Sequence, residues 1–187
     1  VQRIQQFIMI APSTIGVAVF PLMSRLANTD KAQFRTTLEK TLSLIMLIGI
    51  PISLGGAILA DQLIPLIFGH DYSGAIPIMR VIMLMLLISF PLVLLSNAVF
   101  AHNKQKNLAP AYTLGILANI LFNLFLIPKF GAVGSAVATL ISTAIITFIM
   151  WGKVKKIISF EIFSKLKKSF LSAIGAIILM LVFKHLN

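Results

Sequence analysis

Residues 123–142 (NLFLIPKFGAVGSAVATLIS) place two hydrophobic, membrane-length segments back to back across a hairpin of only a few residues. The hairpin is Pro128-Lys129-Phe130-Gly131, and small side chains follow it at three- and four-residue spacing: Ala132, Gly134, Ser135, Ala136, Ala138, Thr139 and Ser142. Small residues at this spacing let helix backbones approach closely inside a bilayer, where packing replaces the hydrophobic effect. The stretch therefore predicts a polytopic helical membrane protein, in which Gly131 and Gly134 serve a tight turn and close packing.

The composition of the whole chain agrees with a membrane protein. Apolar residues make up 58% and charged residues 11% of its 187 residues, whereas a soluble domain carries roughly a quarter charged residues. The net charge of +11 comes from residues between apolar runs, so it indicates orientation in a membrane rather than binding to nucleic acid. The absence of cysteine excludes disulfides and thiolate metal sites. We expect no metal and no cofactor, because the three histidines lack metal-ligand spacing.

Six segments meet or approach the roughly 20 apolar residues that a helix needs to cross a bilayer: 4–26, 42–60, 78–101, 108–127, 132–151 and 170–183. The expected fold is therefore all-α with about six transmembrane helices. We expect a transmembrane lobe at 1–151, a basic amphipathic linker at 152–169 and an additional transmembrane helix at 170–187. The apolar run 63–68 is too brief for a span, and we interpret it as the end of the second helix or an interfacial turn.

The basic residues favour one side of the membrane, and short loops rich in Lys and Arg stay in the cytoplasm. Twelve of the 16 basic residues fall in the first, third and fifth loops between the spans. Only Arg3, Arg80, Lys129 and Lys184 fall on the other side. This alternation predicts that both ends of the chain are outside. The first residues have the pattern of a helix interior rather than of a helix start, so we expect the chain to be part of a longer protein.

The linker 152–169 interleaves lysines with isoleucine and phenylalanine at close to helical spacing. This pattern is typical of an amphipathic helix on the cytoplasmic leaflet, where lysines face anionic lipid; a solvated basic linker is the alternative. Prolines interrupt four of the six spans, among them Pro21, Pro51 and Pro91. Proline-broken helices recur in transporters, although proline is also simply common in membrane helices.

Three short motifs occur in order along the chain. They are F-P-L-M-S-R-L at 20–26, P-L-I-F-G-x-x-Y-x-x-A at 65–75 and N-x-x-L-I-P-x-F-G-x-x-G-S-A-x-A-T at 123–139. Together they resemble the polysaccharide flippases of the multidrug/oligosaccharidyl-lipid/polysaccharide (MOP) superfamily. The motif residues that carry the resemblance are Pro21, Gly69, Tyr72, Pro128, Gly131 and Gly134.

The resemblance implies a MATE-like fold of two six-helix lobes that face each other across a central cavity. This chain would supply the eighth to the twelfth helix and an added thirteenth, with the amino-terminal lobe of the same protein as its partner. The resemblance also implies ion-coupled, alternating-access flipping of an undecaprenyl-pyrophosphate-linked oligosaccharide. The cargo would pass from the cytoplasmic to the periplasmic leaflet of the bacterial inner membrane, for O-antigen, capsule or exopolysaccharide synthesis. Membrane lipids, a polymerase and a ligase are further expected partners.

A pathway for such a substrate needs cations or hydrogen-bond donors in a water-filled cavity. Arg80, near the start of its span, and Arg25, at the cytoplasmic mouth, are the cationic candidates, because a charge inside a membrane is a functional hypothesis by default. Snorkelling explains Arg80 as well, and a positive-inside anchor explains Arg25. Asn97, Asn119 and Asn123 are the deepest polar residues. They suit either sugar hydroxyls or hydrogen bonds between helices.

Other functions are open on the sequence alone. A membrane-embedded polymerase, ligase or glycosyltransferase needs positioned acids and bases. All five acids instead fall in expected loops or helix ends: Asp30, Glu39, Asp61, Asp71 and Glu161. A MATE-like drug antiporter would use a carboxylate inside a span, and we expect none in this chain. A scaffold of polysaccharide assembly is excluded by no residue. The sequence has no G-x-x-x-x-G-K-(S/T) loop, so we expect no nucleotide hydrolysis.

Overall fold

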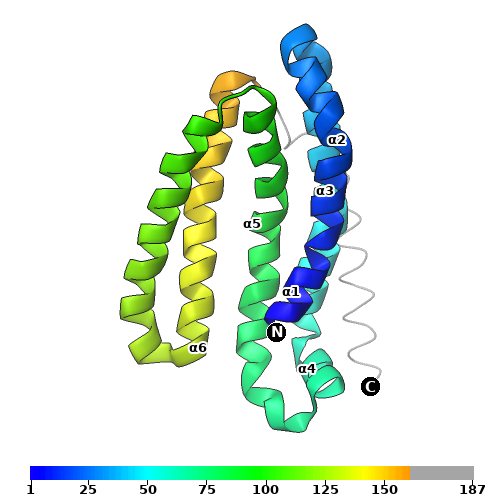
Figure 1. Ribbon diagram of the computed structural model, residues 1–187. Helices are drawn as coiled ribbons and strands as arrows, with labels where there is room; N and C mark the ends of the chain where they lie inside the picture. Colours follow the sequence, from blue (N-terminus) through cyan, green and yellow to red (C-terminus); the bar gives the residue numbers. More distant parts are fainter. Residues whose placement is uncertain (161–187) are drawn as a thin grey trace.

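The computed structural model describes residues 1–160, and every regular element in this range is a helix. The first span consists of α1 (Gln2–Ile8) and α2 (Ile10–Thr29), which meet at Met9 (Figure 1). Four stretches within these residues are long and apolar enough to cross a membrane: Gln2–Thr29, Lys31–Ile58, His70–Ala101 and Leu108–Ile157. The expected all-α, multi-pass fold is therefore confirmed.

A single residue, Asp30, connects α2 to α3 (Lys31–Ile58). Asp30 Oδ1 accepts hydrogen bonds from the backbone N–H groups of Ala32 and Gln33, both at 2.9 Å. These bonds satisfy donors that the start of a helix otherwise leaves without partners. We expected a longer basic loop between the first two spans, and that expectation was wrong. The capped helix begins in the polar region, well before the apolar part of its sequence.

A short separate helix, α4 (Ala60–Phe68), follows α3 at Leu59. Gly69, whose φ is 92°, ends α4, and the 3-10 turn η1 (His70–Ala75) leads into α5 (Ile76–Ala101). The run 63–68 is therefore not the end of the second span but most of a helix of its own. Figure 1 shows α4 and η1 at one end of the bundle, next to the start of α5.

The last described helix, α6 (Leu108–Ile157), reverses direction at Gly131, and Figure 1 shows its two arms side by side. Gly131 has φ 56° and ψ −132°, a conformation that glycine adopts and other residues adopt only under strain. Gly134 lets the arms meet, because a Cβ at this position would clash with the carbonyl oxygen of Leu126. The expected hairpin is confirmed, although Pro128 still lies within the helix and the reversal comes at the glycine.

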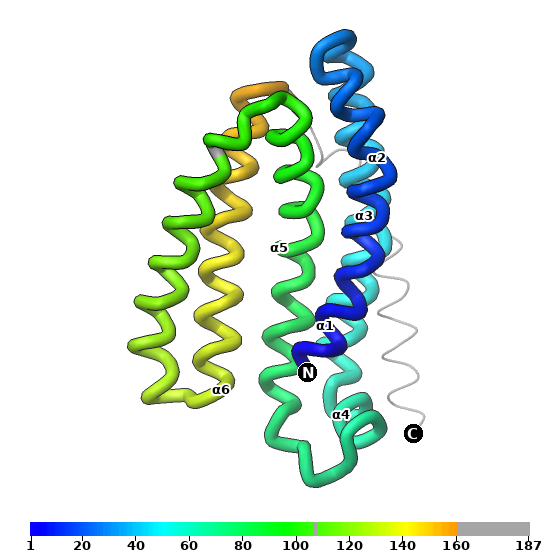
Figure 2. Tube along the Cα trace, in the orientation of Figure 1, coloured from blue at the N-terminus to red at the C-terminus, as the bar shows by residue number. Residues whose placement is uncertain are grey.

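The two ends of the bundle differ in charge as expected. Figure 2 shows the α2–α3 connection, the end of α6, and the α5–α6 connection with η2 (Gln105–Asn107) at the same end. These are the segments rich in Lys and Arg, so the positive-inside rule predicts that this end faces the cytoplasm. The sixth expected span at 170–183 lies outside the described residues. Most of the expected linker does too, and its first residues continue α6 to Ile157.

The α5 helix forms the centre of the bundle, with α2 and α3 on one side and α6 on the other (Figure 2). Large apolar side chains fill the core around it: Met23, Phe34, Leu38, Met83, Leu86, Phe90 and Leu94. Gly49 of α3 lies against the ring of Phe90 and leaves no room for a Cβ. The α2 helix contacts α5 directly, and partly buried side chains of the first span, Ile4, Ile8 and Met9, pack against the same core, beside the candidate site.

Candidate functional site

Polar side chains gather on one face of the first span, where α1 meets α2. A hollow of about 540 Å³ opens there, lined by Gln2, Gln5, Gln6, Met9, Ile10, Ser13 and Thr14. Residues three and four apart share a helix face, and most of these positions follow that spacing. Gln2, Gln6, Ser13 and Thr14 are exposed. The first span thus carries a polar wall, although it is apolar enough overall to cross a membrane.

A second hollow, of about 560 Å³, shares Gln2 and Gln6 with the first. It brings α1 together with α5 and the second arm of α6, and it is lined by Val1, Gln2, Arg3, Gln6, Ile78, Ile82 and Ala136. Arg3 gives this hollow a positive charge. Among the described residues, neither lining includes an aspartate or glutamate. We call the two hollows together the glutamine groove.

The glutamine groove offers neutral hydrogen-bonding groups beside one guanidinium. Amide and hydroxyl side chains both donate and accept hydrogen bonds, which suits a ligand rich in hydroxyls. Exposed amides at membrane depth are costly in lipid, so we expect the groove to face water or a polar ligand rather than acyl chains. Within residues 1–160, no group of three or more His, Cys, Asp or Glu has the arrangement to hold a metal ion.

The groove residues were missing from the candidates that we named from the sequence. The expected first span began at residue 4, so Gln2 and Arg3 fell outside it. Their signal is nevertheless present, because Gln2, Gln6 and Ser13 follow helical spacing in an otherwise apolar run. Helical spacing, which shows that these polar residues share one face, identifies them, whereas depth within a span does not.

Arg80 does not line the groove. Its Nη2 donates to both carboxylate oxygens of Asp61, at 2.8 and 2.6 Å, and so joins α5 to α4. The two side chains are 50% and 41% exposed, so the pair lies at the surface near the end of the bundle that carries α4. The charge of Arg80 is balanced by a carboxylate of the same chain. Its part in a substrate pathway stays a prediction.

Arg25 and Asn97 lie apart from each other. Arg25 is exposed in the last turns of α2, at the basic end of the bundle. Asn97 of α5 faces α2, since a Cβ added to Gly16 would lie 2.9 Å from Asn97 Nδ2. The amide therefore sits at a helix–helix contact, which is a usual place for polar side chains in membrane bundles. The expected pathway roles of both residues stay predictions.

Asn119 and Asn123 lie inside the α6 hairpin. Asn123 Nδ2 donates to the side-chain oxygen and to the backbone carbonyl of Asn119, both at 2.9 Å. Asn119 Nδ2 reaches Thr139 Oγ1 on the other arm, at 3.4 Å. Asn123 Oδ1 is buried and has no hydrogen-bond partner among the described residues. The two amides thus share one face, as expected, and help to connect the arms, while a pathway role stays a prediction.

The other motif residues shape turns and surfaces. Pro21 is exposed inside α2, and Gly69 gives the backbone the positive φ that ends α4. Tyr72 of η1 is 60% exposed, and its ring centroid lies 6.2 Å from that of Phe68. Gly69 with η1, and Gly131 in α6, thus lie where the chain reverses at the end opposite the basic connections, whereas Pro21 lies within a helix.

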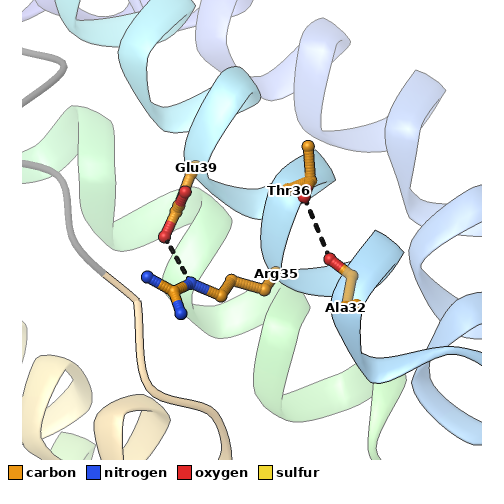
Figure 3. Close-up of polar contacts among 4 residues, drawn as sticks. All are labelled: Ala32, Arg35, Thr36 and Glu39. Carbon is orange, nitrogen blue, oxygen red and sulfur yellow. Dashed lines mark hydrogen bonds and ion pairs between the residues drawn. The ribbon is translucent and has the colours of Figure 1, made fainter.

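Glu39 corrects our expectation that all acidic residues lie in loops or at helix ends. It lies inside α3 and is only 5% exposed. Arg35 Nε donates to Glu39 Oε1 at 2.8 Å, one helical turn away (Figure 3). Figure 3 also shows Thr36 bonded to the carbonyl oxygen of Ala32 on the same helix. The i, i+4 pairing supplies a cation, which offsets part of the free-energy cost of burying this carboxylate.

A family model described as lipid II flippase MurJ matches residues 2–186 of the chain. A solved structure, the lipid II flippase MurJ in an inward closed conformation, superposes with a TM-score of 0.75 at 23% sequence identity. The match covers 98% of this chain and 40% of that one. At this identity the structural likeness establishes a common fold.

Three curated proteins are similar in sequence. The probable low-salt glycan biosynthesis flippase Agl15 of Haloferax volcanii is 24% identical and is matched over 78% of this chain and 31% of its own length. The probable flippase AglR of the same organism is 28% identical, over 75% and 30%. The putative O-antigen transporter of Shigella flexneri is 25% identical, over 69% and 31%. The chain thus spans about a third of the length of these relatives.

Proposed function

The chain belongs to the lipid II flippase MurJ family, and on that premise we propose that it forms part of a flippase for lipid-linked oligosaccharides. The proposed cargo is an undecaprenyl-pyrophosphate-linked repeat unit for polysaccharide synthesis. It moves from the cytoplasmic to the periplasmic leaflet of the bacterial inner membrane. Relatives named as a glycan biosynthesis flippase and an O-antigen transporter support a glycan cargo.

The observation that carries this proposal is the glutamine groove. A span that faced only lipid would have no reason to hold amides and hydroxyls on one face. Sugar hydroxyls pair with the same groups that the groove presents, which are the amides of Gln2, Gln5 and Gln6 and the hydroxyls of Ser13 and Thr14. We propose that the groove is one wall of the path that the glycan follows.

A second wall is part of the proposal. The glutamine groove opens at the surface of the described bundle, so an enclosed path needs another helical bundle opposite it. We propose that residues 1–151 form one lobe, with 152–169 as a basic cytoplasmic linker and 170–187 as an additional helix. The two lobes would rock about the cargo in an ion-coupled, alternating-access cycle, as transporters with a central binding site do.

The test is complementation of a bacterial strain that lacks its polysaccharide flippase, using the complete polypeptide that carries this chain. Wild-type protein is expected to restore surface polysaccharide. A double variant, Gln5→Leu with Gln6→Leu, is expected to reach the membrane at wild-type level yet leave lipid-linked oligosaccharide on the cytoplasmic side. Gln62→Leu is the matched control, because Gln62 is an exposed glutamine in α4 outside the groove.

The two outcomes separate the parts of the proposal. Failure of the wild-type protein to restore polysaccharide, with the protein present in the membrane, would overturn the function. Full activity of the double variant would leave the function standing but remove the groove from the glycan path.

One observation favours a second candidate, a MATE-like small-molecule antiporter. Such antiporters use carboxylates that change charge within the membrane, and Glu39 is a buried carboxylate of α3, three residues before the apolar run that starts at Leu42. Drug resistance conferred by the complete polypeptide, and lost in Glu39→Gln, would support this function. Restored polysaccharide without any change in drug resistance would exclude it.

A further inference from the structure

The helix α4 and the turn η1 form a short protrusion, residues 60–75, that we call the elbow. Three of its apolar or aromatic side chains are widely exposed: Leu66 at 81%, Tyr72 at 60% and Ile67 at 52%. Phe68 is 36% exposed, and its ring lies beside that of Tyr72. The elbow thus ends in an uncharged patch of four large side chains, and we call this the elbow patch.

The elbow is held so that this patch points away from the bundle. Ala60 and Ile64, on the face of α4 opposite Leu66, are fully buried in the core. The Asp61 carboxylate is paired with Arg80 of α5, which fastens the first turn of α4. Gly69 then turns the chain into η1. The orientation of the patch is therefore set by the packing of the buried face of α4 and by the Asp61–Arg80 ion pair at the first turn of that helix.

The length of α5 gives the depth of the elbow in the membrane. With 26 residues at 1.5 Å each, α5 is about 39 Å long, whereas the hydrocarbon core is about 30 Å thick. The first turns of α5 therefore reach the level of the lipid headgroups. The elbow packs beside these turns, at the end opposite the basic connections (Figure 1). By the positive-inside rule this end is the outer one.

We propose that the elbow patch docks on the outer leaflet, with Leu66 and Ile67 entering the boundary between headgroups and acyl chains. Three features select lipid over a protein partner or water. The patch lies at headgroup depth, none of its four side chains is charged, and the charges of Asp61 and Arg80 at the start of the elbow are paired with each other. Asp71, next to Tyr72 in η1, adds one exposed carboxylate beside the patch. Tyr72 adds the amphipathic ring that membrane interfaces favour. The elbow is then an anchor that fixes the outer end of α5 relative to the bilayer.

The proposal is independent of the cargo, so its test does not require transport. The sequence has no cysteine, which permits a single nitroxide label at Leu66→Cys in the complete polypeptide, with any cysteines elsewhere replaced. The protein is reconstituted in vesicles of phosphatidylcholine and phosphatidylglycerol. Collision of the label with oxygen, which concentrates in lipid, is compared with collision with a water-soluble nickel chelate. Ser73→Cys is the matched control, because Ser73 is exposed in η1 but lies outside the patch.

The expected result is that the label at position 66 collides several-fold more often with oxygen, relative to the nickel chelate, than the label at position 73. Equal ratios at the two positions would mean that the patch lies in water, and would overturn the proposal. Slow collision with both reagents at position 66 would mean that protein covers the patch, which also overturns it. Ile67→Cys repeats the measurement on the same surface and guards against a local defect caused by either substitution.

Discussion

Gly134 is the residue on which the α6 hairpin depends most directly, and Gly134→Ala should weaken it. A Cβ at this position would meet the carbonyl oxygen and carbon of Leu126, and it would lie 3.2 Å from the backbone nitrogen of Ile127. These are backbone atoms, so no rotamer change relieves the clash. A carbon normally stays about 3.3–3.6 Å from a carbonyl oxygen even in its closest favourable contacts. The two arms must therefore move apart by roughly 1 Å.

The expected magnitude follows from two opposing effects. Overpacking in a close-packed region costs about 1–3 kcal/mol, and the upper end applies because the obstacle is backbone. Replacing glycine by alanine inside a helix returns about 1 kcal/mol. The net loss is about 2 kcal/mol, which lowers the melting temperature by about 4–8 °C for a unit of this length.

Gly152→Ala is the matched control for this measurement. Gly152 also lies in α6, but a Cβ there would have no neighbour within 4 Å. Only the helix-propensity gain remains, so the melting temperature should rise by about 2–4 °C. Thermal unfolding of the purified protein in detergent, followed by circular dichroism, measures both. Equal or higher stability of Gly134→Ala than wild type would refute the close approach of the two arms.

Three further substitutions give separate tests. Gly131→Ala should destabilise the hairpin by about 1–2 kcal/mol, because the positive φ at the turn is strained for any residue with a Cβ; a melting temperature equal to wild type would contradict this. Asn119→Leu removes the side-chain acceptor of Asn123 and the contact with Thr139, although the backbone acceptor remains, and should cost about 0.6–1.7 kcal/mol in the same assay. Arg80→Gln breaks a half-exposed pair with Asp61 and should change stability by no more than about 1 kcal/mol. Loss of polysaccharide in the complementation assay, with normal stability, would therefore show a role for Arg80 in the pathway.

The sequence predicts the hairpin well because the hairpin depends on local chemistry; the orientation across the membrane stays a prediction. Gly131 stands where the backbone needs a positive φ, and the apolar runs that flank it are long enough to cross a bilayer. The ends of the helices are harder to predict from the sequence, because hydropathy identifies only the part of each helix that crosses lipid. The start of α3 was still readable, because Asp30 followed three residues later by Gln33 is a helix-start signature.

Burial and the choice of face need the tertiary structure. The spacing of Arg35 and Glu39 predicts an ion pair, but only the packing of α3 against its neighbours buries the carboxylate. The same limit applies to the glutamines of α1. A single helix does not specify which side meets lipid and which side meets a cavity, so Gln6 becomes a site residue only once α5 and α6 are placed beside it.

The reversal at Gly131 also bears on how the molecule assembles. The two arms of α6 are joined by a few residues, so closing the loop between them costs little chain entropy. Contacts between neighbours in sequence form sooner than contacts between distant segments. The arms can therefore pair before α5 packs against them, and during synthesis they can enter the bilayer together as one preassembled unit.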